Sequence, residues 1–188
     1  MPLMRVVAGT ARSLRLETVN SLDTRPTTDK IKETLFNILS PDIPDCRFLD
    51  LFAGSGAIGI EALSRGAKQA FFVDQNRKAV DCINKNLTFT RFKDRAEVIT
   101  GDCFCAISSL ERKKQVFDII FMDPPYGRLL EKQILLRLAH SSVLDENTMI
   151  IVESDLATDF SYAEESGFEI YREKKYKTNK HTFLYRRT

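Results

Sequence analysis

The chain has 188 residues, of which 43% are hydrophobic and 29% charged, and its formal net charge is +2. That length fits a single domain with a substantial core, and the composition excludes an intrinsically disordered chain. No apolar run approaches the ~20 residues that a membrane-spanning helix needs, and residues 1–5 lack a signal-peptide apolar region, so we expect a cytoplasmic protein.

The residues that most often bind metals are scattered along the chain. No CxxC pair occurs, and the two histidines are far apart in the sequence. We therefore expect no metal site and reduced thiols. The residues concerned are Cys46, Cys82, Cys103, Cys105, His140 and His181.

Positive charge is concentrated at the two ends of the chain. Residues 1–16 carry three arginines and no acid, and residues 172–188 carry seven basic residues against Glu173. The remaining residues then have a net charge of −7, because the two ends carry +9 within a total of +2. Basic ends on an acidic body indicate a polyanionic partner, provided that the ends meet in space. The alternative is that solvated strands and tails simply carry Lys and Arg.

The N-terminal stretch predicts a small hairpin and one helix. Met4–Ala8 and Ser13–Glu17 are the two hairpin strands, and Thr27 or Thr28 can cap a helix that runs to about Leu39. We expect residues 1–45 to form an extension of a core made by residues 46–188, both within one domain. The apolar face of the predicted helix consists of Ile31, Leu35, Phe36 and Leu39.

The core predicts an alternation of strands and helices. Near-continuous apolar strands that alternate with amphipathic helices are typical of an α/β fold with a mostly parallel twisted sheet and helices on both faces. The expected strands are Arg47–Leu51, Gln69–Asp74, Ala96–Thr100, Val116–Met122 and Thr148–Glu153. The expected helices cover about Gly56–Arg65, Asn76–Phe89, Cys103–Arg112 and Leu129–Ser141.

The pattern changes near the C-terminus. Leu156–Ser166 predicts a further helix that Gly167 ends. Phe168–Arg172 and Thr182–Arg186 alternate polar and apolar residues and are joined by a polar stretch around Thr178–Lys180. This arrangement predicts an antiparallel hairpin added to the parallel sheet.

A glycine-rich turn follows the first core strand. Gly54, Gly56 and Gly59 fit the pattern G-x-G-x-x-G, and Asp74 ends the next strand 20 residues after Gly54. Taken alone, the turn fits a nicotinamide dinucleotide, with Asp74 on the ribose hydroxyls. An oxidoreductase is therefore one hypothesis for this chain.

Three further features favour S-adenosylmethionine (SAM) as the ligand. Asp50, at the end of the first strand, would face a pyrophosphate across the turn and suits a cationic amino-acid tail better. Asp102 follows the third strand and could accept from an adenine amine, with a backbone N–H nearby donating to the ring. The fourth strand ends in the motif described next, so all four loops fall on the edge where such sheets bind ligands. The expected cofactor residues are Asp50, Phe52, Ala53, Gly54, Gly56, Asp74, Asp102 and Cys103.

The fourth strand ends abruptly at Asp123-Pro124-Pro125-Tyr126. Consecutive prolines remove two backbone donors and stiffen the chain, which leaves the Pro124 carbonyl available as an acceptor. That carbonyl and the Asp123 carboxylate could hold the two protons of an exocyclic amine on a nucleobase, while Tyr126 stacks on the ring. The four residues are the candidate catalytic group. The alternative is an ordinary turn at the end of a strand.

These motifs together resemble those of class I SAM-dependent amino-methyltransferases, which have a Rossmann-like fold. Met4–Gly9 and the run from Thr24 to Leu39, with its Arg25-Pro26-Thr27 segment, are similar to the bacterial family that methylates guanine N2 in 16S ribosomal RNA. The resemblance covers essentially the whole chain and implies a small ribosomal subunit as the substrate. It implies RNA contacts by Arg5, Arg12, Arg25, Lys30 and Lys32.

The chain departs from the family pattern at two places. Ser13-Leu14 follows Arg12 where the family commonly has Gly-Arg, and the basic pair around position 30 is lysine. Lysine keeps the charge but lacks the guanidinium fork, so phosphate contacts are expected there rather than specific base contacts.

Other functions remain open at the level of the sequence. A DNA adenine or cytosine amino-methyltransferase would share the motif but usually adds a target-recognition domain, for which this chain has no room. A glutamine-directed protein methyltransferase would carry Asn in place of Asp123. A ribosome-assembly factor that binds SAM without transferring its methyl group is the third alternative. The size favours a monomer.

Overall fold

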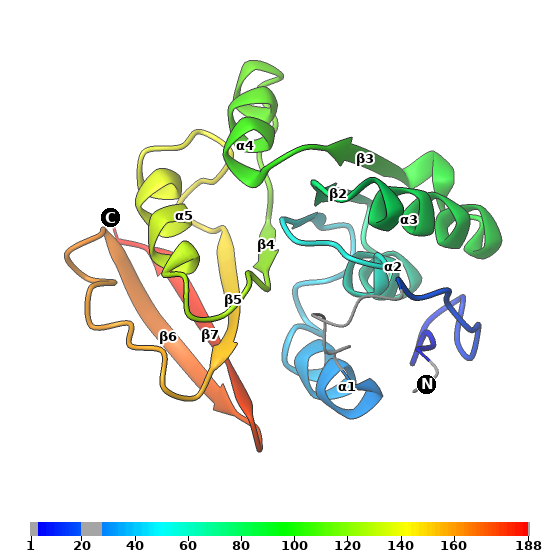
Figure 1. Ribbon diagram of the computed structural model, residues 1–188, viewed down its shortest axis with the longest axis horizontal. Helices are drawn as coiled ribbons and strands as arrows, with labels where there is room; N and C mark the ends of the chain where they lie inside the picture. Colours follow the sequence, from blue (N-terminus) through cyan, green and yellow to red (C-terminus); the bar gives the residue numbers. More distant parts are fainter. Residues whose placement is uncertain (1–3, 20–27, 188) are drawn as a thin grey trace.

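The computed structural model describes residues 4–19 and 28–187. Its centre is a seven-stranded sheet in the order β3-β2-β1-β4-β5-β7-β6. In Figure 1 the two outer strands of the sheet are β3, in green, and β6, in orange. The first five strands are parallel to one another, and β7 is antiparallel to both of its neighbours. The strands are β1 Arg47–Asp50, β2 Gln69–Asp74, β3 Ala96–Thr100, β4 Ile119–Met122, β5 Met149–Asp155, β6 Phe168–Lys175 and β7 Asn179–Arg186.

Helices cover both faces of the sheet. Leu35 and Phe36 of the first helix join one hydrophobic cluster with α2 and α3, whereas α4 and α5 form a second cluster with the opposite face. The Rossmann-like fold with an antiparallel C-terminal hairpin, expected from the sequence, is therefore confirmed. The helices are α1 Asp29–Ile38, α2 Ala57–Ser64, α3 Arg77–Thr90, α4 Cys103–Arg112 and α5 Leu130–Ala139, with a short 3₁₀ turn at Lys93–Arg95.

The strand order reverses between β1 and β4. From β1 the chain proceeds outward to β2 and β3, and it then returns to place β4 on the other side of β1. Loops that leave the carboxyl ends of these two strands diverge and leave a crevice, where open α/β sheets bind their ligands. The loops after β1 and β4 carry the glycine turn and the Asp-Pro-Pro-Tyr motif.

The N-terminal extension begins with a hairpin over residues 4–17, in which Arg5 and Arg15 form the one isolated antiparallel bridge found among the described residues. Backbone bonds from Val6 N to Leu14 O and from Leu16 N to Met4 O, both 2.9 Å, complete it. Thr28 caps α1 by accepting from Ile31 N, as the sequence predicts for one of two threonines. The other candidate, Thr27, lies outside the described residues.

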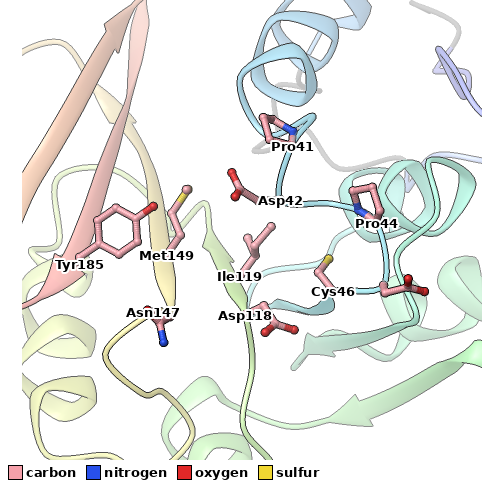
Figure 2. Close-up of a pocket in the computed structure, with 10 residues that line it drawn as sticks. Pro41, Asp42, Pro44, Cys46, Asp118, Ile119, Asn147, Met149 and Tyr185 are labelled. Atoms are coloured by element: carbon pink, nitrogen blue, oxygen red, sulfur yellow. The ribbon is translucent and has the colours of Figure 1, made fainter.

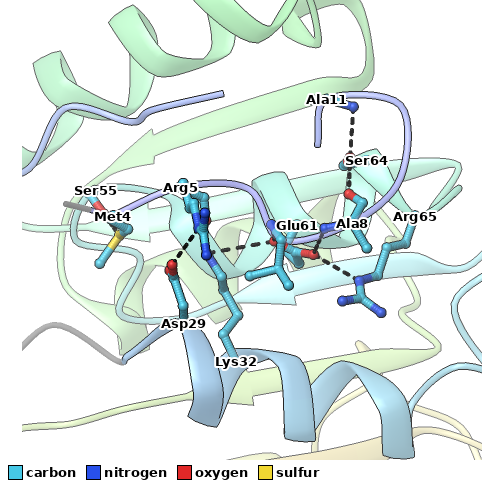
Figure 3. A network of polar contacts seen from close by, with 11 residues as sticks. Met4, Arg5, Ala8, Ala11, Asp29, Lys32, Ser55, Glu61, Ser64 and Arg65 are labelled. Carbon is cyan, nitrogen blue, oxygen red and sulfur yellow. Dashed lines mark hydrogen bonds and ion pairs between the residues drawn. The ribbon is translucent and has the colours of Figure 1, made fainter. Parts of the chain in front are cut away.

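A buried carboxylate on α2 fastens this extension to the core (Figure 3). Glu61 accepts from Val7 N at 2.8 Å and Ala8 N at 3.0 Å, and the Arg65 guanidinium donates to it at 2.8 Å. The Lys32 ammonium lies 3.6 Å from the same carboxylate and donates to the Arg5 carbonyl at 2.5 Å. Both the hairpin and α1 of the extension are thus joined to α2, the helix that follows the glycine turn.

The helix predicted over Leu156–Ser166 is absent, and the chain instead makes turns there. Asp155 Oδ1 accepts from Ala157 N at 2.6 Å and Thr158 N at 3.1 Å, and Asp159 accepts from Ser161 N at 2.9 Å. The Asp155 bonds have the pattern of a helix cap, whereas the Asp159 side chain takes the Ser161 N–H, which a helix would direct to the carbonyl of Ala157. The C-terminal hairpin is also longer than predicted, because Asn179 and Lys180 lie in β7 rather than in the turn.

Candidate active site

The glycine turn brings α2 close to the sheet. Gly54 and Gly56 adopt positive φ angles of 56° and 80°, which favour glycine. Gly59, in the first turn of α2, packs under the ring of Phe72 on β2, where an added Cβ would lie 2.4 Å from Cε1 of that ring. Glycine is therefore required at all three positions of the motif: Gly54 and Gly56 allow the turn, and Gly59 allows α2 to pack closely on β2.

Asp74 at the end of β2 holds this turn in place. Its Oδ2 accepts from Gly54 N at 2.9 Å, and its Oδ1 accepts from Asn76 N at 2.8 Å. A carboxylate oxygen can accept more than one hydrogen bond, so both oxygens retain capacity for ribose hydroxyls. The structure brings Asp74 and the glycine turn together, as the sequence predicts.

Asp50 at the end of β1 is a buried carboxyl group. Burial raises its pKa to about 7, the nearby Asp74 carboxylate adds to the effect, and the Phe52 N–H, 3.4 Å from Oδ1, opposes it. Within the described residues, no Lys or Arg forms an ion pair with Asp50 or Asp74. A cationic ligand would compensate this charge, whereas a pyrophosphate would be repelled by it.

Asp102 precedes α4 and acts as its N-cap. Its Oδ1 accepts from Cys105 N at 3.0 Å and Phe104 N at 2.9 Å, and these bonds lower the pKa of the exposed carboxyl. Cys103 places its side chain in the core, so only its backbone can face a ligand. One oxygen of Asp102 is thus engaged in capping, which the sequence did not predict.

The Asp-Pro-Pro-Tyr motif begins directly after Met122, the last residue of β4. Asp123 is half-buried, Pro124 is buried, and the Tyr126 side chain is exposed. Within the described residues, no backbone N–H bonds to the Pro124 carbonyl. Burial raises the pKa of Asp123 well above its usual value, and the charges of Glu153 and Asp50 add to that effect.

The basic residues expected to contact RNA do not share one environment. Arg5, Arg12 and Lys30 are exposed, and Arg5 Nε donates to Asp29 Oδ2 at 2.8 Å. Lys32 is buried and bonded inside the protein, and burial lowers the pKa of its ammonium, so the expectation that it contacts phosphate is corrected here. Arg25 lies outside the described residues.

A buried polar group beside the motif was missed by the sequence reasoning. Glu153 on β5 accepts from Asn179 Nδ2 at 2.5 Å and lies 3.1 Å from His181 Nε2. Glu153 follows the apolar residues Met149–Val152 of β5, just as Asp123 follows the apolar residues of β4, and this similarity was the available signal.

A cavity of about 330 Å³ lies at the opposite, amino edge of the sheet and contains none of the predicted site residues. Figure 2 shows Pro41 and Pro44, from the segment before β1, on one side of it, with Met149 and Tyr185 on the other. Burial raises the pKa of Cys46 in its wall to about 12, so that thiol stays protonated. The cavity is separate from the candidate active site.

The sheet order and the four loops at its carboxyl edge define a class I methyltransferase fold. Solved structures agree with this assignment. The structure of yhhF from Escherichia coli matches with a TM-score of 0.82 and 33% identity, covering 99% of each chain. The ribosomal protein L11 methylase from Lactobacillus delbrueckii shares the fold with a TM-score of 0.66 at 18% identity, covering 84% of this chain and 80% of that one.

Sequence comparisons narrow the class to a family. Residues 4–185 match the family model described as conserved hypothetical protein 95. Ribosomal RNA small subunit methyltransferase D of Haemophilus influenzae is 40% identical over 158 residues, which cover 81% of this chain and 79% of the relative. The Escherichia coli K12 protein of that name is 39% identical over 153 residues, covering 81% and 75%. The chain belongs to this family of ribosomal RNA small subunit methyltransferases.

Proposed function

We propose that this protein transfers the methyl group of SAM to the exocyclic N2 amine of a guanine in 16S ribosomal RNA. The observation that carries the proposal is Asp123-Pro124-Pro125-Tyr126 at the end of β4, next to the uncompensated Asp50 carboxyl at the end of β1. The family relatives named as small-subunit rRNA methyltransferases support the choice of substrate.

The acceptor groups of the motif suit an aromatic amine. The Asp123 carboxylate and the Pro124 carbonyl would each accept one N2–H, and the exposed Tyr126 ring would stack on the base. Holding both protons directs the amine lone pair out of the plane of the ring and toward the methyl group. With SAM bound, the amine nitrogen would take the methyl group from the sulfonium sulfur, which would leave as a neutral thioether, and the Asp123 carboxylate that holds the N2–H would accept the proton that the methylated amine loses.

SAM, when bound, supplies an electrophilic methyl group on a positively charged sulfur. We assign its amino-acid end to Asp50 and the glycine turn, its ribose to Asp74, and its adenine to Asp102 and the backbone at Cys103. The carboxylates of Asp50, Asp74 and Asp102 suit a ligand that carries positive charge, because its cationic groups would neutralise them. The complete proposed set is Asp50, Phe52, Ala53, Gly54, Gly56, Asp74, Asp102 and Cys103.

The N-terminal extension is proposed to hold the RNA. Arg5, Arg12 and Lys30 are exposed cations there, and Arg25 belongs to the same sequence segment. Their contacts would be to phosphate groups, so binding should weaken steeply with salt. We propose residues 1–45 as the RNA-binding part, residues 46–188 as the catalytic core, and a cytoplasmic monomer as the working form.

The direct test is methyl transfer from labelled SAM. Unmethylated small subunits, naked 16S RNA, DNA and a protein mixture serve as parallel acceptors, and nucleoside analysis identifies the product. Label in N2-methylguanosine from the subunits supports the proposal. Label only in DNA or protein keeps the transferase activity but refutes the ribosomal substrate, and SAM binding without any transfer favours a non-catalytic assembly factor.

The oxidoreductase hypothesis is tested by NADH binding. We expect none, because the carboxyl of Asp50 would lie close to the dinucleotide's pyrophosphate. NADH binding with micromolar affinity, together with no SAM binding, would overturn the cofactor assignment.

A further inference from the structure

Three acidic side chains lie on one face of the sheet at its carboxyl edge. Asp50 pairs with Phe121 in the β1–β4 register, and Asp123 is two residues beyond Phe121, so both side chains point to the same face. Met122 pairs with Val152 in the β4–β5 register, which places Asp123 and Glu153 at the next adjacent positions of neighbouring strands. Glu153 is therefore the side-by-side neighbour of the candidate catalytic carboxyl.

Glu153 is held by residues from the C-terminal hairpin. It pairs with His181 in the β5–β7 register, and Asn179 Nδ2 donates to its Oε1 at 2.5 Å. On the other oxygen, Oε2, Glu153 makes a hydrogen bond of 3.1 Å with His181 Nε2. The second ring nitrogen of His181, Nδ1, makes a hydrogen bond of 3.0 Å with the Tyr176 hydroxyl. Glu153, Asn179 and His181 are all buried.

The packing around this chain of hydrogen bonds is tight. The His181 ring meets the edge or face of Phe121 on β4, of Phe183 on β7 and of Tyr176, with centroid separations between 5.1 and 6.5 Å. A histidine locked on three sides has one orientation, and it fixes the carboxylate bonded to it. The preceding residue, Lys180, points to the opposite face, where its ammonium lies over the ring of Phe160.

We propose that Glu153 is a positioning residue for methyl transfer, acting on the target amine through the neighbouring Asp123 carboxyl, and that Asn179, His181 and Tyr176 hold it in place. The inference rests on the proposed function. A fixed negative charge beside Asp123 makes that carboxyl a stronger acceptor for the N2–H, which becomes acidic as the methyl group arrives. The ionisable groups from the adjacent elements are Asp50 on β1, Glu153 on β5, His181 on β7 and Tyr176 in the β6–β7 turn.

The electrostatic state of Asp123 agrees with this arrangement. Its pKa is raised first by burial and then by Glu153, with Asp50 as the smaller contribution. Tyr176 also responds to Glu153: its pKa rises to about 12, mainly through burial and then through that carboxylate. Removal of the Glu153 charge should therefore lower the pKa of Asp123.

The test combines a titration without substrate and a rate profile with it. Carboxyl ¹³C NMR of the free protein follows the Asp123 signal, which an Asp123→Asn sample identifies, in the wild type and in Glu153→Gln. Glu173→Gln is the matched control, because Glu173 lies in the same hairpin but is paired with Lys180 at 2.7 Å. Tyr176→Phe is a second, milder variant that keeps the ring and removes only the hydroxyl next to His181.

We expect the Asp123 titration and the acid limb of kcat to move toward lower pH by about one unit in Glu153→Gln. We also expect the plateau kcat to fall about tenfold, with SAM affinity within about threefold of the wild type and Glu173→Gln unchanged. In Tyr176→Phe the same changes should appear with smaller size, which keeps the test valid if Glu153→Gln fails to fold.

The opposite results distinguish two failures. In the first case the wild type methylates small subunits, but no variant that folds shifts the Asp123 titration or the acid limb of kcat. That result refutes the role of Glu153 and leaves the proposed function intact. A wild type that transfers no methyl group to any acceptor refutes the proposed function, and with it this role for Glu153.

Discussion

Replacement of Glu61 by alanine is expected to release the N-terminal hairpin, residues 4–17, while the sheet stays folded. The carboxylate accepts two backbone N–H groups of the extension and lies within an ion-pair distance of Lys32 and Arg65. Loss of one partner of a buried ion pair costs ~3–5 kcal/mol, and each orphaned buried N–H adds about 1–3 kcal/mol. Detachment of residues 4–17 would return these groups to water, which limits the total to about 4 kcal/mol.

Two measurements check this expectation. The melting temperature of Glu61→Ala should fall by roughly 8–16 °C, from the usual 2–4 °C per kcal/mol for a domain of this size. Hydrogen exchange followed by mass spectrometry should show loss of protection in residues 4–17, with β1 and β4 still protected.

Two control variants distinguish the loss of the buried Glu61 contacts from the simple loss of one negative charge. Glu164→Ala removes an exposed acid, 3.9 Å from Arg187, and should cost less than about 0.5 kcal/mol. A double variant, Lys32→Met with Glu61→Gln, should be more stable than Glu61→Gln alone, because no buried ammonium is left unpaired. A loss below about 1 kcal/mol in Glu61→Ala, or an extension that stays protected, would show that the network does not fasten it.

Further predictions concern the site itself. Asp123→Ala should abolish methyl transfer and leave SAM affinity in calorimetry nearly unchanged; loss of SAM binding would contradict the assigned role. Gly59→Ala should lower the free energy of unfolding in urea by about 1–3 kcal/mol, because the new Cβ meets the Phe72 ring, and an unchanged midpoint would argue against this packing. The raised pKa of Asp50, about 7 in the fold against 3.8 as its ordinary value, means that the folded protein keeps a proton that the unfolded chain has lost. This carboxyl should therefore reduce stability as pH rises from 4 to 7, by up to about 1.4 kcal/mol per pH unit; Asp50→Asn should remove that slope and weaken SAM binding, and an unchanged slope would refute the burial argument. Arg12→Gln should reduce the salt dependence of binding to small subunits by about one unit of log–log slope, whereas an unchanged slope would place Arg12 outside the interface.

Much of the fold was predictable because its signals are local. The central strand β4 is buried throughout and appears in the sequence as a continuous apolar run, and β1 is buried from its second residue onward. The glycines of the turn follow one of those runs directly, and the Asp-Pro-Pro-Tyr motif follows the other. The order of these loops along the chain, combined with the rule that ligands bind at the carboxyl edge, was enough to bring the site residues together.

The rest depends on contacts between distant residues. From the sequence, Lys32 was expected to be a surface cation, because nothing in the sequence shows that it forms a buried ion pair with Glu61 on α2. The alignment of Glu153 with His181 depends on the β5–β7 register, and periodicity alone cannot give the register of two strands. The helix expected at Leu156–Ser166 failed for another reason, because the Asp159 side chain takes the Ser161 N–H, which a helix would direct to the carbonyl of Ala157.

The order of strands at the C-terminal end of the sheet has a consequence for synthesis of the protein. β6 is made before β7, yet it pairs only with β7, which separates it from β5. A nascent chain that has emerged only as far as β6 already carries every loop of the proposed SAM site, but Glu153 still lacks Asn179 and His181. The sheet and the hydrogen-bond chain behind Asp123 can therefore close only after β7 has left the ribosome, and full activity should not appear before that point.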